Sequence, residues 1–158
     1  GLAMVTVVGQ CVGAGEYDQA RRYMLRLTGL VYATMGTLEI CMGLTAGFWA
    51  GLFHLPAETT AITVQLVRSF AVFALIFWPT SFALPNGLRA AGDVRFTMLV
   101  SALSMWIFRV GFSFFLCGPA VGMGVMGVWL AMYIDWIARC GAFGWRFLSG
   151  RWRGQQVI

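Results

Sequence analysis

Three charged side chains, Glu39, Arg109 and Asp135, interrupt apolar stretches that are each long enough to be a membrane-spanning helix. An isolated charge at the centre of a bilayer costs at least about 2.5–3.5 kcal/mol, so each of these residues needs a partner or a water-filled cavity. Membrane proteins place such charges on proton relays, ion sites and substrate pathways. These residues are therefore the first candidates for function.

Arg109 and Asp135 lie equally far, in residues, from the charged ends of their segments. If those segments are antiparallel neighbours, the two side chains reach the same depth and neutralise one another. The pattern predicts an intramembrane ion pair that is mostly structural. The alternative is that the same pair relays a proton or contacts a substrate.

Glu39 lies near the middle of its apolar run, and Arg68 is the one basic residue of comparable depth in a neighbouring run. We interpret Glu39 as a candidate transport or ion-coupling residue, which binds a cation or a proton at a cavity. The alternative is a protonated, inert carboxyl packed against protein.

Other chemistry has little support in the residues. His54 is the only histidine and stands beside a turn, which excludes a multi-histidine metal site and leaves no catalytic pair at depth. The GAG at 13–15 lacks the rest of a nucleotide-binding motif. No metal-ligand spacing relates the four cysteines, Cys11, Cys41, Cys117 and Cys140. We therefore predict no enzyme activity and no catalytic, cofactor-binding or metal-binding residues.

The composition indicates the elements that must position these charges. Hydrophobic residues make up 59% of the chain and charged residues only 11%, and the mean hydropathy is +0.78. A soluble domain carries roughly a quarter charged residues, so the exterior of this chain must face lipid. The formal charge of +5 comes from arginines that fall mostly at helix ends, which favours topology signals over nucleic-acid binding.

We predict an all-α, polytopic membrane bundle. The chain opens inside an apolar run, so we expect its first segment to be part of a helix. The predicted segments are a partial helix at about 1–14 and four spanning helices at about 23–53, 60–84, 96–117 and 121–148.

The arginines are distributed unevenly among the predicted loops. The turns at 15–26 and 86–95 and the segment from 146 onward hold three, two and three arginines, whereas the turns at 54–60 and 117–124 hold none. Positively charged loops stay on the cytoplasmic side. This pattern predicts a cytoplasmic C-terminus.

The stretch LPNGLRAAGDVRF at 84–96 joins two of the predicted spans. We predict a hinge at the cytoplasmic surface, where the prolines kink and end the helix at 60–84 and the glycines permit unusual dihedral angles. The two charges of opposite sign, four residues apart, could pair or cap the next helix. Simple anchoring by positive charge is the alternative. The predicted hinge residues are Pro79, Pro85, Gly87, Arg89, Gly92 and Asp93.

Four stretches, in order and spacing, resemble the C-terminal lobe of a bacterial multidrug and toxic compound extrusion (MATE) transporter. They are VGQCVGAGEYDQARR at 8–22, WPTSFALPNGLRAAGDVRFTM at 78–98, SMWIFRVGFSF at 104–114 and GVWLAMYIDWIARCGAFGWRFLSGRW at 127–152. The resemblance implies twelve helices in two six-helix lobes, of which residues 1–158 would be the end of helix eight to helix twelve.

The resemblance further implies a secondary antiporter of the bacterial inner membrane. Such a protein exports amphipathic, often cationic drugs in exchange for Na⁺ or H⁺ by rocking its lobes. The implied partners are the lipid bilayer, the N-terminal lobe and small organic substrates, with no nucleic acid.

One feature departs from the family. MATE proteins commonly carry ion-coupling carboxylates on helices one, seven or ten, and the segment at 60–84, the tenth, holds no acid within its span. We therefore transfer no cation site from the family. A lipid-linked oligosaccharide flippase of the same superfamily, which needs a more basic cavity, and a non-transporting membrane scaffold remain as alternatives.

Overall fold

The computed structural model describes residues 1–119 and 121–154, and every regular element within them is helical. This confirms the all-α prediction. The elements are α1 (Leu2–Gly13), α2 (Tyr17–Leu52), α3 (Ala57–Trp78), η1 (Pro79–Ala83), α4 (Leu84–Ala90), α5 (Val94–Ser104), η2 (Met105–Gly111), α6 (Phe112–Cys117) and α7 (Val125–Leu148), where η1 and η2 are π-helical.

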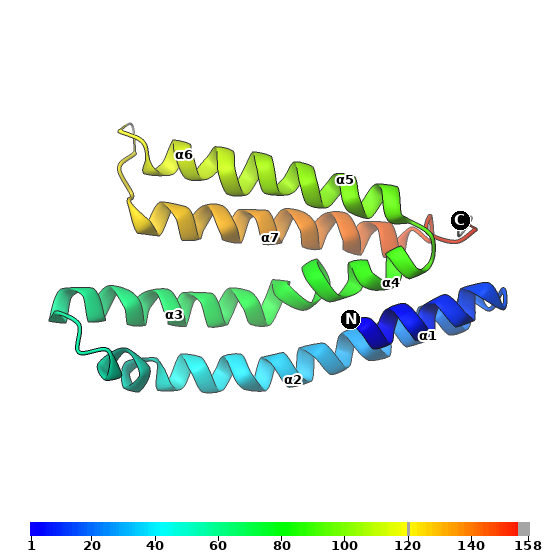
Figure 1. Cartoon of the computed structure of the whole chain (residues 1–158), viewed down its shortest axis with the longest axis horizontal. Helices are drawn as coiled ribbons and strands as arrows, with labels where there is room; N and C mark the ends of the chain where they lie inside the picture. Colours follow the sequence, from blue (N-terminus) through cyan, green and yellow to red (C-terminus); the bar gives the residue numbers. More distant parts are fainter. Residues whose placement is uncertain (120, 155–158) are drawn as a thin grey trace.

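The helices form an elongated bundle of roughly antiparallel rods (Figure 1). The turn from α1 to α2, the turn from α4 to α5 and the end of α7 gather at one end, which we call the basic end. The connections from α2 to α3 and from α6 to α7 lie at the opposite end. The segments that carry most of the arginines therefore share one end, as the charge pattern predicted.

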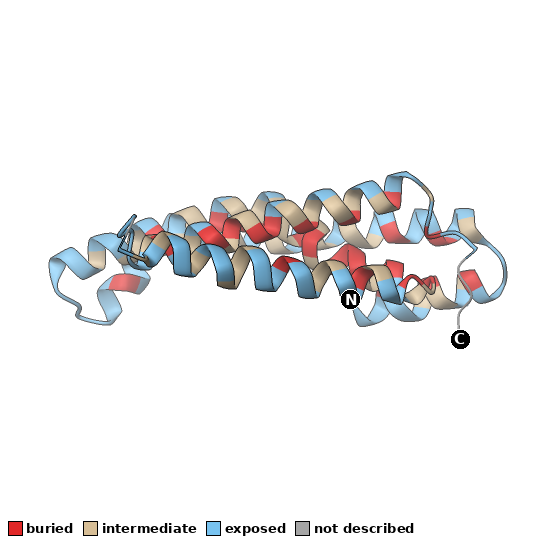
Figure 2. Cartoon of the chain, turned by 90° about the horizontal axis from the view of Figure 1, so that it is seen from above, coloured by how far each residue is buried: buried red, intermediate tan, exposed pale blue. Residues whose placement is uncertain are grey.

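Three continuous helices are long and apolar enough to cross a bilayer: Tyr17–Leu52, Ala57–Ala90 and Val94–Cys117. The expected fourth, α7, has sufficient length at 24 residues but is less apolar because it carries three charged side chains. Its role as a span stays a prediction. Buried residues line the interior of the bundle and exposed residues cover much of its outer surface (Figure 2). Large apolar side chains such as Phe114, 78% exposed, suit contact with lipid.

The largest core cluster lies at the basic end, where α1, α2, α4 and α7 meet. Its most buried members include Met4, Val8, Met24, Leu88, Phe143 and Trp152. A second cluster joins α3 to α7 through Ala74, Tyr133 and Trp136. These clusters hold the rods side by side and fix the positions of the charges between them.

The sequence analysis expected Pro79 and Pro85 to end a helix at residue 84, and the structure shows that they do not. The backbone stays helical from Ala57 to Ala90. Pro79 begins the π-helical segment, in which the Leu84 N–H donates to the Pro79 carbonyl five residues earlier. A local π turn changes the hydrogen-bonding register, so the helix absorbs a proline that lacks a donor. Pro85 stands in the first turn of α4, where a proline is tolerated.

The predicted hinge is consequently shorter than the stretch at 84–96, since only Ala91–Asp93 lies outside a helix. Gly92 has φ +91°, which favours glycine. Gly87 is helical instead, and a Cβ there would lie 2.8 Å from the Met24 Cγ, so it serves close packing rather than bending. The last two predicted helices are also displaced slightly: one begins at Val94, and α7 begins only at Val125.

Candidate functional site

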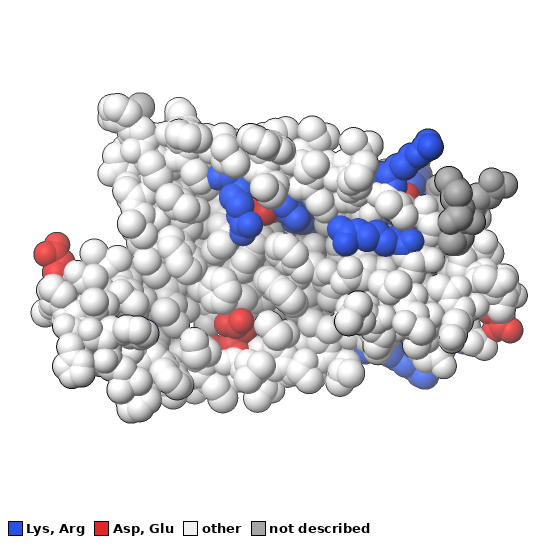
Figure 3. All heavy atoms as spheres, in the orientation of Figure 1, with Lys and Arg blue, Asp and Glu red and all other residues white. Residues whose placement is uncertain are grey.

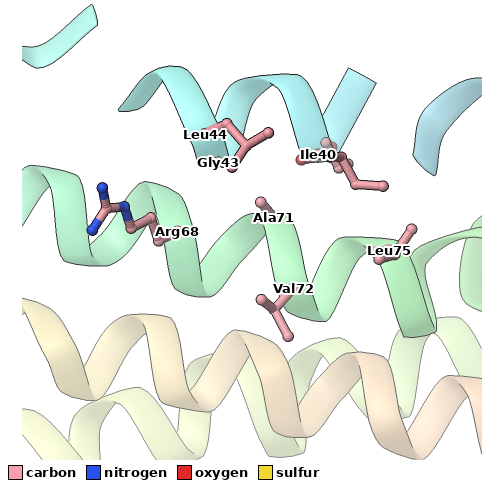
Figure 4. A pocket seen from close by; sticks show the side chains of 8 residues that line it. Ile40, Gly43, Leu44, Arg68, Ala71, Val72 and Leu75 are labelled. Atoms are coloured by element: carbon pink, nitrogen blue, oxygen red, sulfur yellow. The ribbon is translucent and has the colours of Figure 1, made fainter. Parts of the chain in front are cut away.

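Glu39 is half-buried on α2 and lines a hollow of about 380 Å³ between α2 and α3. One other lining residue is charged, Arg68, and the rest are glycine or aliphatic. These are Ile40, Gly43, Leu44, Ala71, Val72 and Leu75 (Figure 4). The hollow is thus an apolar space at membrane depth that holds a carboxylate.

Two glycines of α2, Gly36 and Gly43, let α2 and α3 approach closely on either side of Glu39. A Cβ on Gly43 would lie 3.3 Å from the Ala71 Cβ, and a Cβ on Gly36 would lie 2.9 Å from a Leu75 methyl. Nearer the basic end, the Tyr32 hydroxyl donates to the Ile76 carbonyl at 2.9 Å. These contacts fix the spacing of the two helices that form the hollow.

Arg68 lies at one end of the hollow, and its side chain is exposed (Figure 4). Neither Glu39 nor Arg68 belongs to an ion pair among the described residues. Within the described residues, the Glu39 carboxylate therefore makes no direct ion pair, although Arg68 lines the same hollow. A site of this kind can hold the charged group of an amphipathic cation while the aliphatic walls cover its apolar part.

Asp135 pairs with Arg139 rather than with Arg109, which corrects the predicted ion pair. Asp135 is fully buried on α7, and its Oδ1 accepts from the Arg139 Nε at 2.9 Å and from the Ser104 hydroxyl. The physical reason is helical geometry, because a side chain four residues along the same helix reaches the carboxylate without any interhelical fit. Arg109 lies on η2 and is half-buried, outside the ion pairs of the described residues.

Arg139 connects α7 to two neighbouring helices. Its Nη2 donates to the Ser101 carbonyl on α5 at 3.0 Å, and its guanidinium carbon lies 5.4 Å from the centroid of the Phe82 ring on η1. The sequence analysis missed this residue, although its spacing of four from Asp135 was a visible signal. Among the described residues the Asp135 Oδ2 has no hydrogen-bond partner. The cluster thus joins α7, α5 and η1 around an ion pair, and its structural role stays a prediction.

Asp93 pairs with Arg146 of α7 instead of with Arg89, which corrects the pairing expected in the hinge. The Arg146 Nε donates to Asp93 Oδ2 at 2.6 Å and Nη2 donates to Oδ1 at 3.1 Å. Arg89 instead donates to the Asn86 side chain at 3.5 Å. Asp93 is the N-cap residue of α5, but its side chain makes no capping bond. The turn is therefore tied to α7, and its role as a hinge stays a prediction.

Comparison with known proteins gives these features a family. The MatE family model matches residues 1–115 of this chain. The chain belongs to the MatE family.

Curated relatives agree. A probable multidrug resistance protein NorM of Rhodopseudomonas palustris is 26% identical over 92% of this chain and 31% of its own length. The corresponding protein of Thermotoga maritima is 23% identical over 99% of the chain and 33% of its own length, and an uncharacterized transporter YisQ of Bacillus subtilis is 23% identical over 83% and 29%. The chain spans about a third of the length of these relatives. No solved structure matches it.

Proposed function

We propose that this chain is part of a membrane antiporter that exports amphipathic, often cationic organic compounds in exchange for Na⁺ or H⁺. It acts as a transporter and not as an enzyme. The observation that carries the proposal is the position of Glu39, a half-buried carboxylate that lies outside the ion pairs of the described residues and lines an apolar hollow of about 380 Å³. Small-molecule sites commonly have volumes of about 300–1,000 Å³.

The exchange follows from competition for one carboxylate. While Glu39 is ionised, it attracts an organic cation, and the aliphatic wall formed by Leu44, Val72 and Leu75 covers the apolar part. A proton or Na⁺ that binds the carboxylate removes this attraction, and the organic cation leaves. One acid beside one base disfavours a pyrophosphate-linked substrate, which needs a more basic site.

The proposal places residues 1–158 in one lobe of a two-lobed protein in a bacterial inner membrane. The other lobe completes the transport path, and the two lobes rock around it. Several relatives of similar sequence are named as probable multidrug resistance proteins, which supports the substrate class. On the face drawn in Figure 3, basic side chains lie from the middle of the bundle toward the basic end, which supports a cytoplasmic C-terminus.

Efflux of a fluorescent organic cation, such as ethidium, tests the proposal in bacteria that lack their own major efflux pumps. The full-length protein that contains this chain should export the dye, and Glu39→Gln should slow export at least about tenfold per folded molecule. Glu58→Gln is the matched control, because Glu58 lies outside the hollow, in the first turn of α3 at the end of the bundle opposite the basic end. Unchanged export by Glu39→Gln, or equal loss in both variants, would contradict the proposal.

A further inference from the structure

A second, polar hollow lies against the first turns of α2, at the basic end. Its volume is about 210 Å³, and its lining residues are Gln19, Arg22, Tyr23 and Arg26. Spacings of three and four residues place these side chains on one face of the helix. The hollow thus holds two guanidinium groups, one amide and one phenol, and no acid lines it.

Arg22 and Arg26 differ from other arginines at this end. Arg146 and Arg153 each pair with an aspartate, and the Arg21 guanidinium lies 5.7 Å from an aromatic ring centroid. Within residues 1–119 and 121–154, no ion pair, side-chain hydrogen bond or ring contact involves Arg22 or Arg26. Two adjacent positive charges therefore face the hollow without an anionic partner among these residues.

The length of α2 places this hollow at the membrane surface. The helix has 36 residues, which is about 54 Å, whereas the hydrocarbon core is about 30 Å thick. The part after Arg26 contains one charged residue, Glu39, and is long enough to cross the core by itself. Arg22 and Arg26 consequently lie at the level of the lipid headgroups. Tyr23, 38% exposed, is of a type enriched at that level.

We propose that this hollow binds the phosphate group of an anionic phospholipid. The guanidinium groups of Arg22 and Arg26 donate to the phosphate oxygens. Gln19 and Tyr23 provide hydrogen-bonding groups for the polar part of the headgroup beyond the phosphate. The acyl chains follow the exposed apolar surface of α2 toward the middle of the membrane, beginning one turn beyond Arg26 at Leu30, which is 58% exposed. This site holds a structural lipid and is separate from the hollow at Glu39.

Native mass spectrometry of the purified full-length protein tests the site, with phosphatidylglycerol and phosphatidylcholine added in equal amounts. The wild type should retain phosphatidylglycerol preferentially. In the double variant Arg22→Gln/Arg26→Gln the half-saturating phosphatidylglycerol concentration should rise by on the order of tenfold. The matched control is Arg89→Gln/Arg95→Gln, which removes the same charge from the same end but outside the hollow. It should change retention less than threefold.

A thermal-shift titration with the same lipids and with inorganic phosphate distinguishes the source of the anion. Phosphatidylglycerol should raise the unfolding midpoint of the wild type, and inorganic phosphate at equal concentration should not. Equal losses in the two double variants would overturn the proposal, because the attraction would then be diffuse. An equal response to inorganic phosphate would overturn it as well, because the site would then bind a free anion.

Discussion

Glu39 and Asp135 are both carboxylates inside long apolar helices, yet their surroundings differ in one decisive respect. Asp135 has a cation four residues along its own helix, and the two side chains form a pair at 2.9 Å that is almost fully buried. Glu39 is half-buried, lines an apolar hollow and belongs to no ion pair of the described residues. Under the proposed function, the carboxylate with a partner on its own helix serves structure, whereas the one that faces a hollow binds a mobile cation.

The largest effect should follow from breaking the Asp135 pair. Asp135→Asn or Arg139→Gln leaves a buried hydrogen-bonding group or charge without its partner, and such changes commonly destabilise by about 3–5 kcal/mol. We expect the yield of folded full-length protein, measured by size-exclusion chromatography in detergent, to fall several-fold in each variant.

The comparison also requires that Arg109 contribute less than Arg139. Arg109→Gln should leave most of the folded yield intact, since the structure gives the carboxylate of Asp135 to Arg139. A loss as large as that of Arg139→Gln would show that Arg109 is the working partner of Asp135 and would restore the interhelical pair.

A smaller effect should follow from filling the hollow beside Glu39. Val72 lines the hollow and is 55% exposed. The larger side chain of Val72→Trp should therefore fill part of the hollow without disturbing a buried core. Efflux of a bulky cation should fall about three- to tenfold while the unfolding midpoint changes little. Ile137→Trp is the control, because Ile137 is similarly exposed, 45%, but lies on α7 outside this hollow. Equal efflux by both variants would contradict the assignment of the hollow.

The helices could be predicted from the sequence because the thickness and apolar character of the membrane set the length and the composition of a spanning helix. It placed a helix end at Leu84 because proline usually ends helices in water, whereas this helix absorbs Pro79 through a π turn and continues to Ala90. The prediction that Gly87 is a hinge residue failed for a different reason. Its close contact with Met24 comes from the packing of two helices and cannot be seen in the local sequence.

The candidate site was only partly predictable. Glu39 was identified from its depth, and Arg68 from its comparable position, but the hollow that both line depends on how closely α2 and α3 approach. The partner of Asp135 was predicted from equal depth on neighbouring helices, and the nearer candidate, Arg139, was passed over. Spacing of four on one helix needs no packing and should have taken precedence.

The central claim is that Glu39 serves transport and Asp135 serves structure. It is tested most directly by measuring the transport rate per folded molecule for Glu39→Gln and Asp135→Asn side by side. The full-length variants are reconstituted at equal folded protein, and uptake of a fluorescent cation is driven by a defined Na⁺ or H⁺ gradient. We predict that Glu39→Gln folds normally and transports poorly, whereas the folded remainder of Asp135→Asn transports at nearly the wild-type rate. Normal folding with lost transport in Asp135→Asn, together with full transport in Glu39→Gln, would contradict this account.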